Sequence, residues 1–255
     1  MLTSAEALLL DAFDLQERDR IVTFLTRERG KVRGVAKGAR RKYSRFAGQL
    51  QPLAKVKVTW FESEGRELVR ISGVEPVRPA GRLLDALEDI LLGSYLAEHL
   101  LLFAQENEPA ELYYRLLDST VEALLAGVDR DLAARFFEIW MLRLAGVFPS
   151  PVECPACGRE MEAARGAVLP ASGEGLVCAG CGAPGGLAPP GALAVPPEVL
   201  ALLERFGHVR LAELANEAPP AADLATVEQI AARVRRSFLQ HELKSYGVMQ
   251  RTLGR

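Results

Sequence analysis

DRIVTFLTRERGKVRGVAKGARRKYSRF, residues 19–46, combines a strand-like alternation of side chains with a dense run of positive charge. Between positions 27 and 45 it holds nine Lys or Arg residues and a single acid, Glu28. The formal net charge of the whole chain is nevertheless −2. A ligand responds to the local patch rather than to the sum, so this segment predicts a binding surface for a polyanion.

The alternation in this stretch predicts a β-hairpin. Ile21, Thr23 and Leu25 alternate with the residues between them, and residues 28–30 supply a turn that ends in glycine. In the following strand Lys31, Arg33 and Lys37 fall on one face. A solvated strand face is the alternative, but the scarcity of acids and the small residues at 30, 34 and 38, which let a phosphate backbone approach, favour nucleic acid. The candidate DNA-binding residues are Arg29, Lys31, Arg33, Lys37, Arg40, Arg41, Lys42 and Arg45.

The rest of the first 79 residues predicts further short strands at 8–13, 55–60 and 68–74, with a polar, basic loop at 38–49. About five short strands, one long loop and a basic face indicate a small closed barrel of the OB type. Trp60 and Phe61 are candidates for base stacking. Trp60 shares its face with Val56 and Val58, so a place in the barrel core is the favoured alternative for it.

Helical periodicity replaces the alternation after residue 79. The pattern predicts a helix that begins near Leu83 and others at 110–125, 131–145, 198–206 and 223–239, with Phe238 among the inward residues of the last. Residues 82–131 carry eleven acids and three basic residues. We expect this acidic surface to be solvated and to repel phosphates, which would confine nucleic acid to the barrel.

Four cysteines form two C-x-x-C-G motifs, Cys154 with Cys157 and Cys178 with Cys181. Two such turns complete a tetrahedral four-thiolate site, and the spacing predicts one structural Zn²⁺ in a zinc ribbon. Four thiolates leave no open position on the metal, which argues against a hydrolase. Redox or disulfide use is the alternative, although a single C-x-x-C would suffice for redox work.

The fold class expected is therefore a multidomain α+β protein: an N-terminal OB-fold β-barrel, an α-helical domain and an inserted four-cysteine zinc ribbon. The expected division is a nucleic-acid-binding barrel at 1–79, helical parts at 80–150 and 191–245, the ribbon at 151–190, and a basic tail at 246–255. We expect the chain from Lys244 to be loosely held.

The sequence offers no catalytic constellation. His99, His208 and His241 are isolated from one another, and the glycines near residue 34 are not followed by the Gly-Lys-Ser/Thr of a phosphate-binding loop. The apolar run at 90–104 is interrupted by Glu98 and His99 and is too short for a membrane span. We expect no signal sequence, because the apolar run at 7–10 is too short for one and no basic segment precedes it. We expect a cytoplasmic, nucleoid-associated protein that is not an enzyme.

Several segments together resemble the RecO family of recombination mediators. They are DRIVTFLTRERGKVRGVAKGARR at 19–41, SRFAGQLQP at 44–52, RFFEIWMLRLAGVFP at 135–149, CPACG at 154–158 and HELKS at 241–245. The resemblance covers nearly the whole chain. It implies binding to single- and double-stranded DNA, annealing of complementary strands, and action with RecR to load RecA onto DNA coated by the single-strand-binding protein. Some members lack a full cysteine set, so the zinc prediction rests on this chain's own cysteines. An RNA-binding OB and zinc-ribbon protein of translation or transcription is the second hypothesis.

The resemblance also implies a contact with the acidic tail of the single-strand-binding protein. Arg135 and Arg143 lie eight residues apart on a predicted helix, hence about 12 Å apart along one face, and are the candidates. Phe136 and Phe137 would receive the apolar end of the tail. The alternative is that both aromatic residues belong to the core and the arginines are merely solvated.

Overall fold

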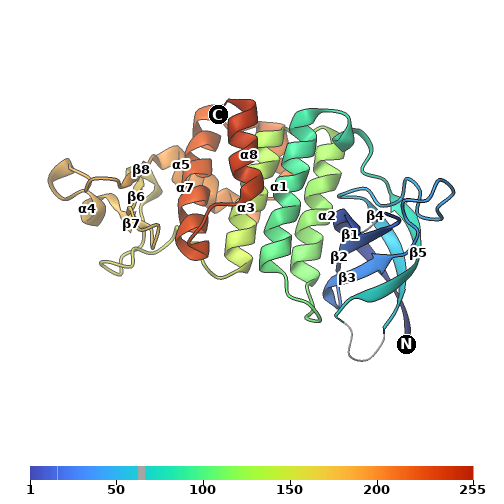
Figure 1. The fold of residues 1–255 in the computed structure, drawn as a ribbon. Coiled ribbons are helices and arrows are strands. Elements are labelled where there is room, and N and C mark those ends of the chain that lie inside the picture. The colour runs from blue at the N-terminus through green and yellow to red at the C-terminus, as the bar shows by residue number, and fades with distance from the viewer. Residues whose placement is uncertain (16, 63–66, 255) are drawn as a thin grey trace. The chain divides into compact units, whose positions relative to one another are not determined.

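The structure, a computed structural model, describes residues 1–15, 17–62 and 67–254. The chain forms two compact units (Figure 1), one of Met1–Leu125 with Leu243–Arg255 and one of Ala126–Glu242. Within the described residues, no helix combines the length and the apolar character needed to cross a membrane. The expected five-part division of the chain stays a prediction.

The first unit contains the predicted five-stranded barrel. Its strands are β1 (Leu2–Leu15), β2 (Asp19–Thr26), β3 (Gly30–Ala36), β4 (Lys55–Phe61) and β5 (Val69–Arg78), in the order β1-β2-β3-β5-β4. β1 is longer than predicted, and a register shift between Leu9 and Asp11 bends it. Its first half therefore pairs with β4 and its second half with β2, which closes the barrel. With the parallel contact between β3 and β5, this arrangement confirms the OB-type fold class.

The barrel interior follows the alternation in the sequence. The buried residues on β3 are Gly30, Val32, Gly34 and Ala36; of the two cations that alternate with them, Lys31 is partly buried and Arg33 is exposed. Trp60 is 1% exposed and its indole N–H donates to Glu62 at 3.0 Å, so its place is in the core, as favoured, and it cannot stack on a base. Gly34 packs so closely on β5 that a Cβ would lie 2.6 Å from the Cδ1 of Ile71.

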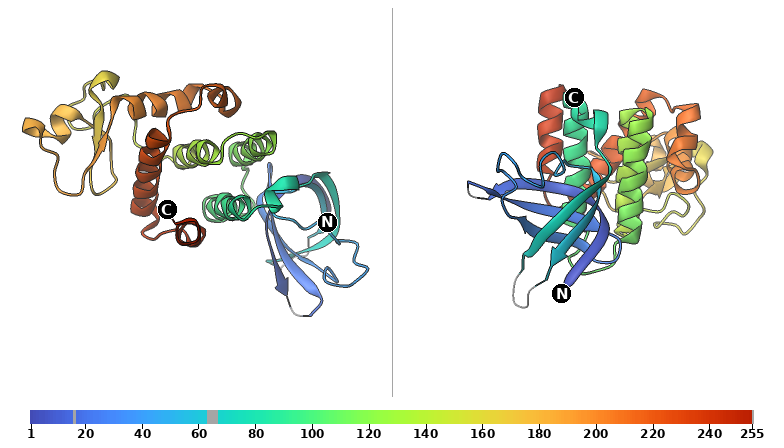
Figure 2. Two further views of the ribbon diagram at one scale, coloured as in Figure 1. Left: turned by 90° about the horizontal axis from the view of Figure 1, so that it is seen from above. Right: turned by 90° about the vertical axis from the view of Figure 1, so that its right-hand side faces the viewer.

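Three helices complete the first unit, and Figure 2 shows two of them beside the barrel. They are α1 (Leu87–Phe103), α2 (Glu111–Ala126) and α8 (Lys244–Leu253), with a short turn η1 (Gly81–Leu84) before α1. The α1–α2 connection is hydrogen-bonded to the β2–β3 turn. The Lys31 N–H donates to the Gln105 carbonyl at 2.9 Å, and the Ala110 N–H donates to the Arg27 carbonyl at 2.7 Å.

The acids of the helical section do not all form a separate solvated surface, which corrects one expectation. Asp118 on α2 lies between two barrel cations, 2.9 Å from the Lys55 Nζ and 2.8 Å from an Arg78 guanidinium nitrogen. All three side chains are more than four-fifths buried. Glu122 adds a second carboxylate 3.0 Å from Arg78. Tertiary folding thus uses part of the acidic charge to join α2 to the barrel.

The C-terminal segment is not loosely held, contrary to expectation. The Glu98 carboxylate on α1 accepts hydrogen bonds from the backbone N–H groups of Lys244 at 3.1 Å and Ser245 at 2.8 Å, where α8 begins. Those N–H groups have no partner inside the helix, so a carboxylate satisfies them and complements the helix dipole. Tyr246 packs on Tyr95 with ring centroids 5.7 Å apart, and Met249 is buried. Residue 255 lies outside the described part.

The second unit is built on three long helices, α3 (Arg130–Leu144), α5 (Pro197–His208) and α7 (Ala221–Leu239). Asp129 caps α3, because its side chain accepts from the N–H groups of Asp131 and Leu132, each at 3.0 Å. α7 packs on α3 as expected, but Phe238 is half exposed rather than inward. It lines a cavity of about 560 Å³ together with Phe148 and Leu176.

The cysteine segment lies between α3 and α5 in the sequence. It contains a three-stranded sheet and several short helices. The strands are β6 (Ala167–Leu169), β7 (Val177–Cys178) and β8 (Leu193–Val195); the short helices are η2 (Ala163–Arg165), α4 (Ala179–Gly182) and η3 (Pro184–Gly186). Two further short helices, α6 (Leu211–Leu214) and η4 (Ala215–Glu217), connect α5 to α7.

We expect Asp118→Ala to destabilise the chain by about 3 kcal/mol, because it leaves the largely buried Lys55 and Arg78 facing each other without their shared counter-ion. Glu122→Ala is the matched control, since that carboxylate is 61% exposed and an exposed pair contributes less than about 1 kcal/mol. Urea unfolding of the wild type and both variants measures the change in the free energy of unfolding. Equal, small losses would show that Asp118 does not join the helices to the barrel.

Candidate nucleic-acid interface and metal centre

The predicted cations divide into those whose charge already meets a protein carboxylate or carbonyl group and those whose charge does not. Lys31 belongs to the first group, because its Nζ donates to the Leu101 carbonyl at 2.6 Å. Burial lowers the pKa of Lys31, and the neighbouring charge of Arg33 lowers it further, against the opposing effect of Glu106. The ammonium group thus faces the C-terminal turn of α1, where carbonyl groups attract a cation.

Three arginines of the set form exposed ion pairs. Arg29 lies 3.4 Å from Glu62, Arg33 lies 3.9 Å from Glu106, and Arg40 lies 3.2 Å from Asp14. Pairs this exposed are weak, and a phosphate can compete with the carboxylate for the guanidinium group. Arg29, Lys31 and Arg33 also border a cavity of about 210 Å³ that Glu62 and Glu106 share.

The remaining four cations, Lys37, Arg41, Lys42 and Arg45, are exposed. Among the residues that the structure describes, none of these four lies within ion-pair distance of an acid. They all belong to the segment that follows β3, residues 37–49, which we call the basic loop. Positive charge without a local counter-ion is therefore concentrated in the basic loop rather than along β3.

The basic loop is fixed to the barrel at its first turn. The Gly38 N–H donates to the Asp19 carboxylate at 2.8 Å, and the Arg40 N–H donates to the Arg18 carbonyl at 3.1 Å. Gly38 has φ +71°, a conformation that favours glycine. At the far end Phe46 is buried in the barrel core. The role of Asp19 cannot be read from local sequence, because its hydrogen-bond partner, Gly38, lies nineteen residues away.

Close approach of phosphate does not explain the glycines at 30, 34 and 38, which corrects the expectation. A Cβ on Gly30, whose φ is +56°, would lie 2.2 Å from the Gln105 carbonyl oxygen. Gly34 faces the barrel interior, and Gly38 serves the turn. These glycines make room for the protein's own backbone and side chains.

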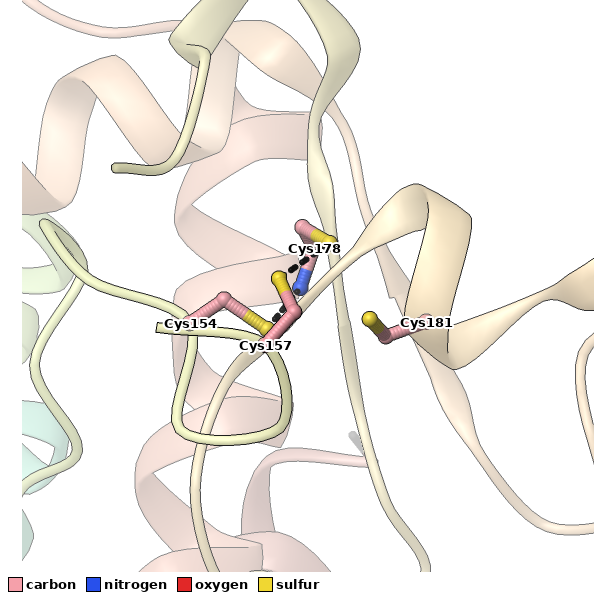
Figure 3. Close-up of side chains that lie close together, drawn as sticks. All are labelled: Cys154, Cys157, Cys178 and Cys181. Carbon is pink, nitrogen blue, oxygen red and sulfur yellow. Dashed lines mark hydrogen bonds between the residues drawn. The ribbon is translucent and has the colours of Figure 1, made fainter. Parts of the chain in front are cut away.

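The four cysteines converge on one point, as Figure 3 shows. Cys154 and Cys157 lie in the loop that follows α3, Cys178 ends β7, and Cys181 lies in α4. The four Sγ atoms are all within 4.8 Å of one another, and the Sγ atoms of Cys157 and Cys178 are 3.9 Å apart. Ligands about 2.3 Å from a tetrahedral metal are about 3.8 Å apart, whereas a disulfide needs about 2.05 Å. The cluster therefore has the dimensions of a four-thiolate metal site.

Local groups favour the thiolate form of Cys154 and Cys157 and oppose it at Cys181. The Arg159 side chain and N–H lower the pKa of Cys157 to about 6. Burial opposes ionisation of Cys154, but N–H groups, first that of Cys178 at 3.3 Å, outweigh it and lower its pKa. The Cys178 and Cys157 thiols in turn raise the pKa of Cys181 to about 12. Crowded thiols cannot all ionise by themselves, and a divalent cation would stabilise all four as thiolates.

The proposed docking face for an acidic tail is wrong at Arg135. This side chain is 2% exposed and lies 3.0 Å from Glu138 and 2.7 Å from Glu228. Phe136 and Phe137 are core residues, as the alternative held, but Arg135 is buried rather than solvated. Arg143 is partly exposed; its guanidinium group donates to the Leu203 carbonyl at 2.6 Å and lies over the Trp140 and Phe148 rings. The structure does not bring the two arginines together on an open surface.

These features define the class of protein: an OB-type barrel with a cation-rich loop, joined in one chain to a helical unit with a candidate metal-binding cluster. Comparison with known families agrees. The family model described as Recombination protein O N terminal matches residues 1–80, and that described as Recombination protein O C terminal matches residues 84–247.

Individual relatives cover nearly the same range. A protein named DNA repair protein RecO from Anaeromyxobacter sp. (strain K) is 38% identical over 238 residues, 92% of this chain and 89% of the relative. One from Geobacter metallireducens is 37% identical over 203 residues, 80% and 79% of the two chains. One from Nocardioides sp. is 34% identical over 258 residues, 98% and 100%. The chain belongs to the RecO family of DNA repair proteins.

We expect Asp19→Ala to loosen the basic loop, because it removes the acceptor of the Gly38 N–H. Loss of one such hydrogen bond, about 1 kcal/mol, corresponds to roughly fivefold more opening and hence faster trypsin cleavage between residues 37 and 45. Glu17→Ala, a nearby exposed acid, is the control. Mass spectrometry of the fragments formed early in the digestion measures the rate of this cleavage in both variants. Equal cleavage rates in both variants would mean that Asp19 does not hold the loop.

Proposed function

We propose that this chain is a non-enzymatic DNA-binding recombination mediator that acts through the basic loop of its barrel. The observation that carries the proposal is the group of four exposed cations, Lys37, Arg41, Lys42 and Arg45, in a loop anchored at both ends. Anchoring lowers the conformational entropy lost on binding, and cations without an ion pair need not release a carboxylate before they meet a phosphate. Arg29, Arg33 and Arg40 add contacts when phosphate displaces their acids.

Both single- and double-stranded DNA present such phosphates, so the proposed surface serves either. Neutralised strands repel each other less, which favours the annealing of complementary strands. The relatives named as DNA repair proteins favour DNA over the RNA of translation or transcription as the ligand. We place this activity at the nucleoid, where the DNA lies.

The proposed protein partners are those that the resemblance to the RecO family implies. We propose that the chain acts with RecR to load RecA onto DNA coated by the single-strand-binding protein. For the acidic tail of that protein we retain Arg143, the partly exposed arginine of α3, and we withdraw Arg135 because its charge is already neutralised in the interior.

We further propose that the four cysteines hold one structural Zn²⁺. Zinc suits four thiolates in tetrahedral array, and the site leaves no position for substrate. Cys154, Cys157, Cys178 and Cys181 would hold the ion and thereby join the loop after α3 to β7 and α4. A segment with few long elements of its own would gain stability from such ligation.

Charge reversal in the loop tests the DNA proposal. Lys37→Glu with Arg41→Glu should weaken binding to DNA of any sequence and flatten the plot of log K against log salt by roughly 0.7 per lost single-strand contact. The same variant should anneal complementary strands more slowly. The matched control is Arg165→Glu with Arg251→Glu, which changes the net charge equally at exposed positions outside the loop. Fluorescence anisotropy across a salt series gives both quantities. Identical affinity and slope in the two double variants would remove the loop from the DNA site.

Removal of one thiolate tests the metal proposal. Cys178→Ala should abolish zinc binding and loosen the cysteine segment, while DNA binding by the barrel is retained because the basic loop belongs to the other compact unit. Ser172→Ala, in the same segment, is the control. Elemental analysis should find about one zinc per chain in the wild type and control. Acidification should release the metal, because protonated thiols are poor ligands. A wild-type protein purified without zinc would refute the assignment.

A further inference from the structure

The basic loop carries one aromatic side chain that the barrel does not use. Tyr43 is 90% exposed, the highest value among the large apolar and aromatic residues of the described chain. It lies between Lys42, whose Nζ is 5.6 Å from the centre of the ring, and the segment that leads to Arg45. The fold leaves this ring in water, and the ring stands beside Lys42 and near Arg41 and Arg45, which pair with no acid within the described residues.

Hydrogen bonds close the backbone on the N-terminal and C-terminal sides of Tyr43 into turns. Successive turns are closed by hydrogen bonds from the Arg41 N–H to the Gly38 carbonyl and from the Ser44 N–H to the Arg41 carbonyl, at 3.1 and 3.0 Å. On either side, Ala39 packs against the barrel core and Phe46 is buried in it. Two neighbouring aromatic residues thus have opposite roles: Phe46 points inward and anchors the loop, and Tyr43 points outward.

An exposed ring beside cations matches one kind of ligand. An unpaired nucleobase offers a flat face for stacking, and its phosphates supply the negative charge. The bases of a duplex are stacked on each other and hide those faces. Trp60 is buried, and Phe61 lies beside Glu62, whose carboxylate already pairs with Arg29, so neither of the aromatic residues first considered combines a free ring with unpaired cations.

We propose that Tyr43 is a stacking platform for one unpaired base and gives the loop a preference for single-stranded DNA over duplex. This inference rests on the proposed function, because the cations of the same loop must bind the flanking phosphates. The stacked base becomes unavailable to the ring once it pairs with its complement. Annealing therefore weakens this contact and favours release of the duplex product.

The test compares Tyr43→Ala and Tyr43→Phe on three ligands at one salt concentration: an oligothymidylate, an abasic strand of equal length, and a duplex. Tyr43→Ala should bind oligothymidylate about 5- to 160-fold more weakly, with unchanged affinity for the abasic strand and the duplex and an unchanged salt slope. Tyr43→Phe keeps the ring and should stay within about twofold of the wild type. Circular dichroism melting confirms that the variants are folded, as an exposed position predicts.

Two outcomes would overturn the proposal. One is unchanged binding of oligothymidylate by Tyr43→Ala, and the other is an equal loss on all three ligands. The charge-reversal variant at Lys37 and Arg41 separates this failure from failure of the proposed function. If the charge-reversal variant binds all three ligands more weakly while Tyr43→Ala binds all three as the wild type does, the loop binds DNA without stacking. If both variants bind all three ligands with wild-type affinity, the loop is not the DNA site and both proposals fail.

Discussion

The first unit depends on one strand that hydrogen-bonds along two edges. β1 pairs with β4 through its first half and with β2 through its second, and the register shift at Leu9–Asp11 lets it turn from one to the other. Without this bend the five strands would form an open sheet with two exposed edges. Closure fixes which face of β3 is inside. The same closure sets the ends of β3 and β4, and so it sets where the basic loop leaves and rejoins the barrel.

Charge in this unit is divided between two tasks. Largely buried pairs, of which Asp118 with Lys55 and Arg78 is the centre, attach α2 to the barrel, and their charges are committed to the fold. Exposed pairs such as Arg33 with Glu106 are weaker and can exchange partners. Four cations of the basic loop, Lys37, Arg41, Lys42 and Arg45, form no ion pair with an acid within the described residues, whereas Arg40 pairs with Asp14. A near-neutral chain thereby keeps a local surface that attracts phosphate, since its acids are used where they neutralise structural cations.

The cysteine cluster depends on a different kind of constraint. Within each C-x-x-C motif the ligands are close in sequence, and tertiary folding has to bring together two turns rather than many residues. β7 and α4 place Cys178 and Cys181, and the loop after α3 places the other pair. The N–H group of Cys178 and the side chain of Arg159 then favour negative charge on sulfur. This local construction explains why the spacing in the sequence was sufficient to predict that the four thiols lie close together.

The sequence by itself determined the features that depend on near neighbours in the chain: the alternation that makes Val32 and Ala36 inward, the helical periods, the pairs of thiols, and the family. Only the tertiary structure decided which charges are available. Arg135 and Arg41 look alike in sequence, but one is enclosed by Glu138 and Glu228 and the other is exposed in a loop. The fate of an ionic or aromatic side chain depends on partners that are distant in sequence, as Asp118 is from Lys55, and on which face the closed barrel turns to water. The local pattern of residues contains neither piece of information, so the sequence alone does not show that Phe46 is buried in the barrel core while Tyr43 is exposed.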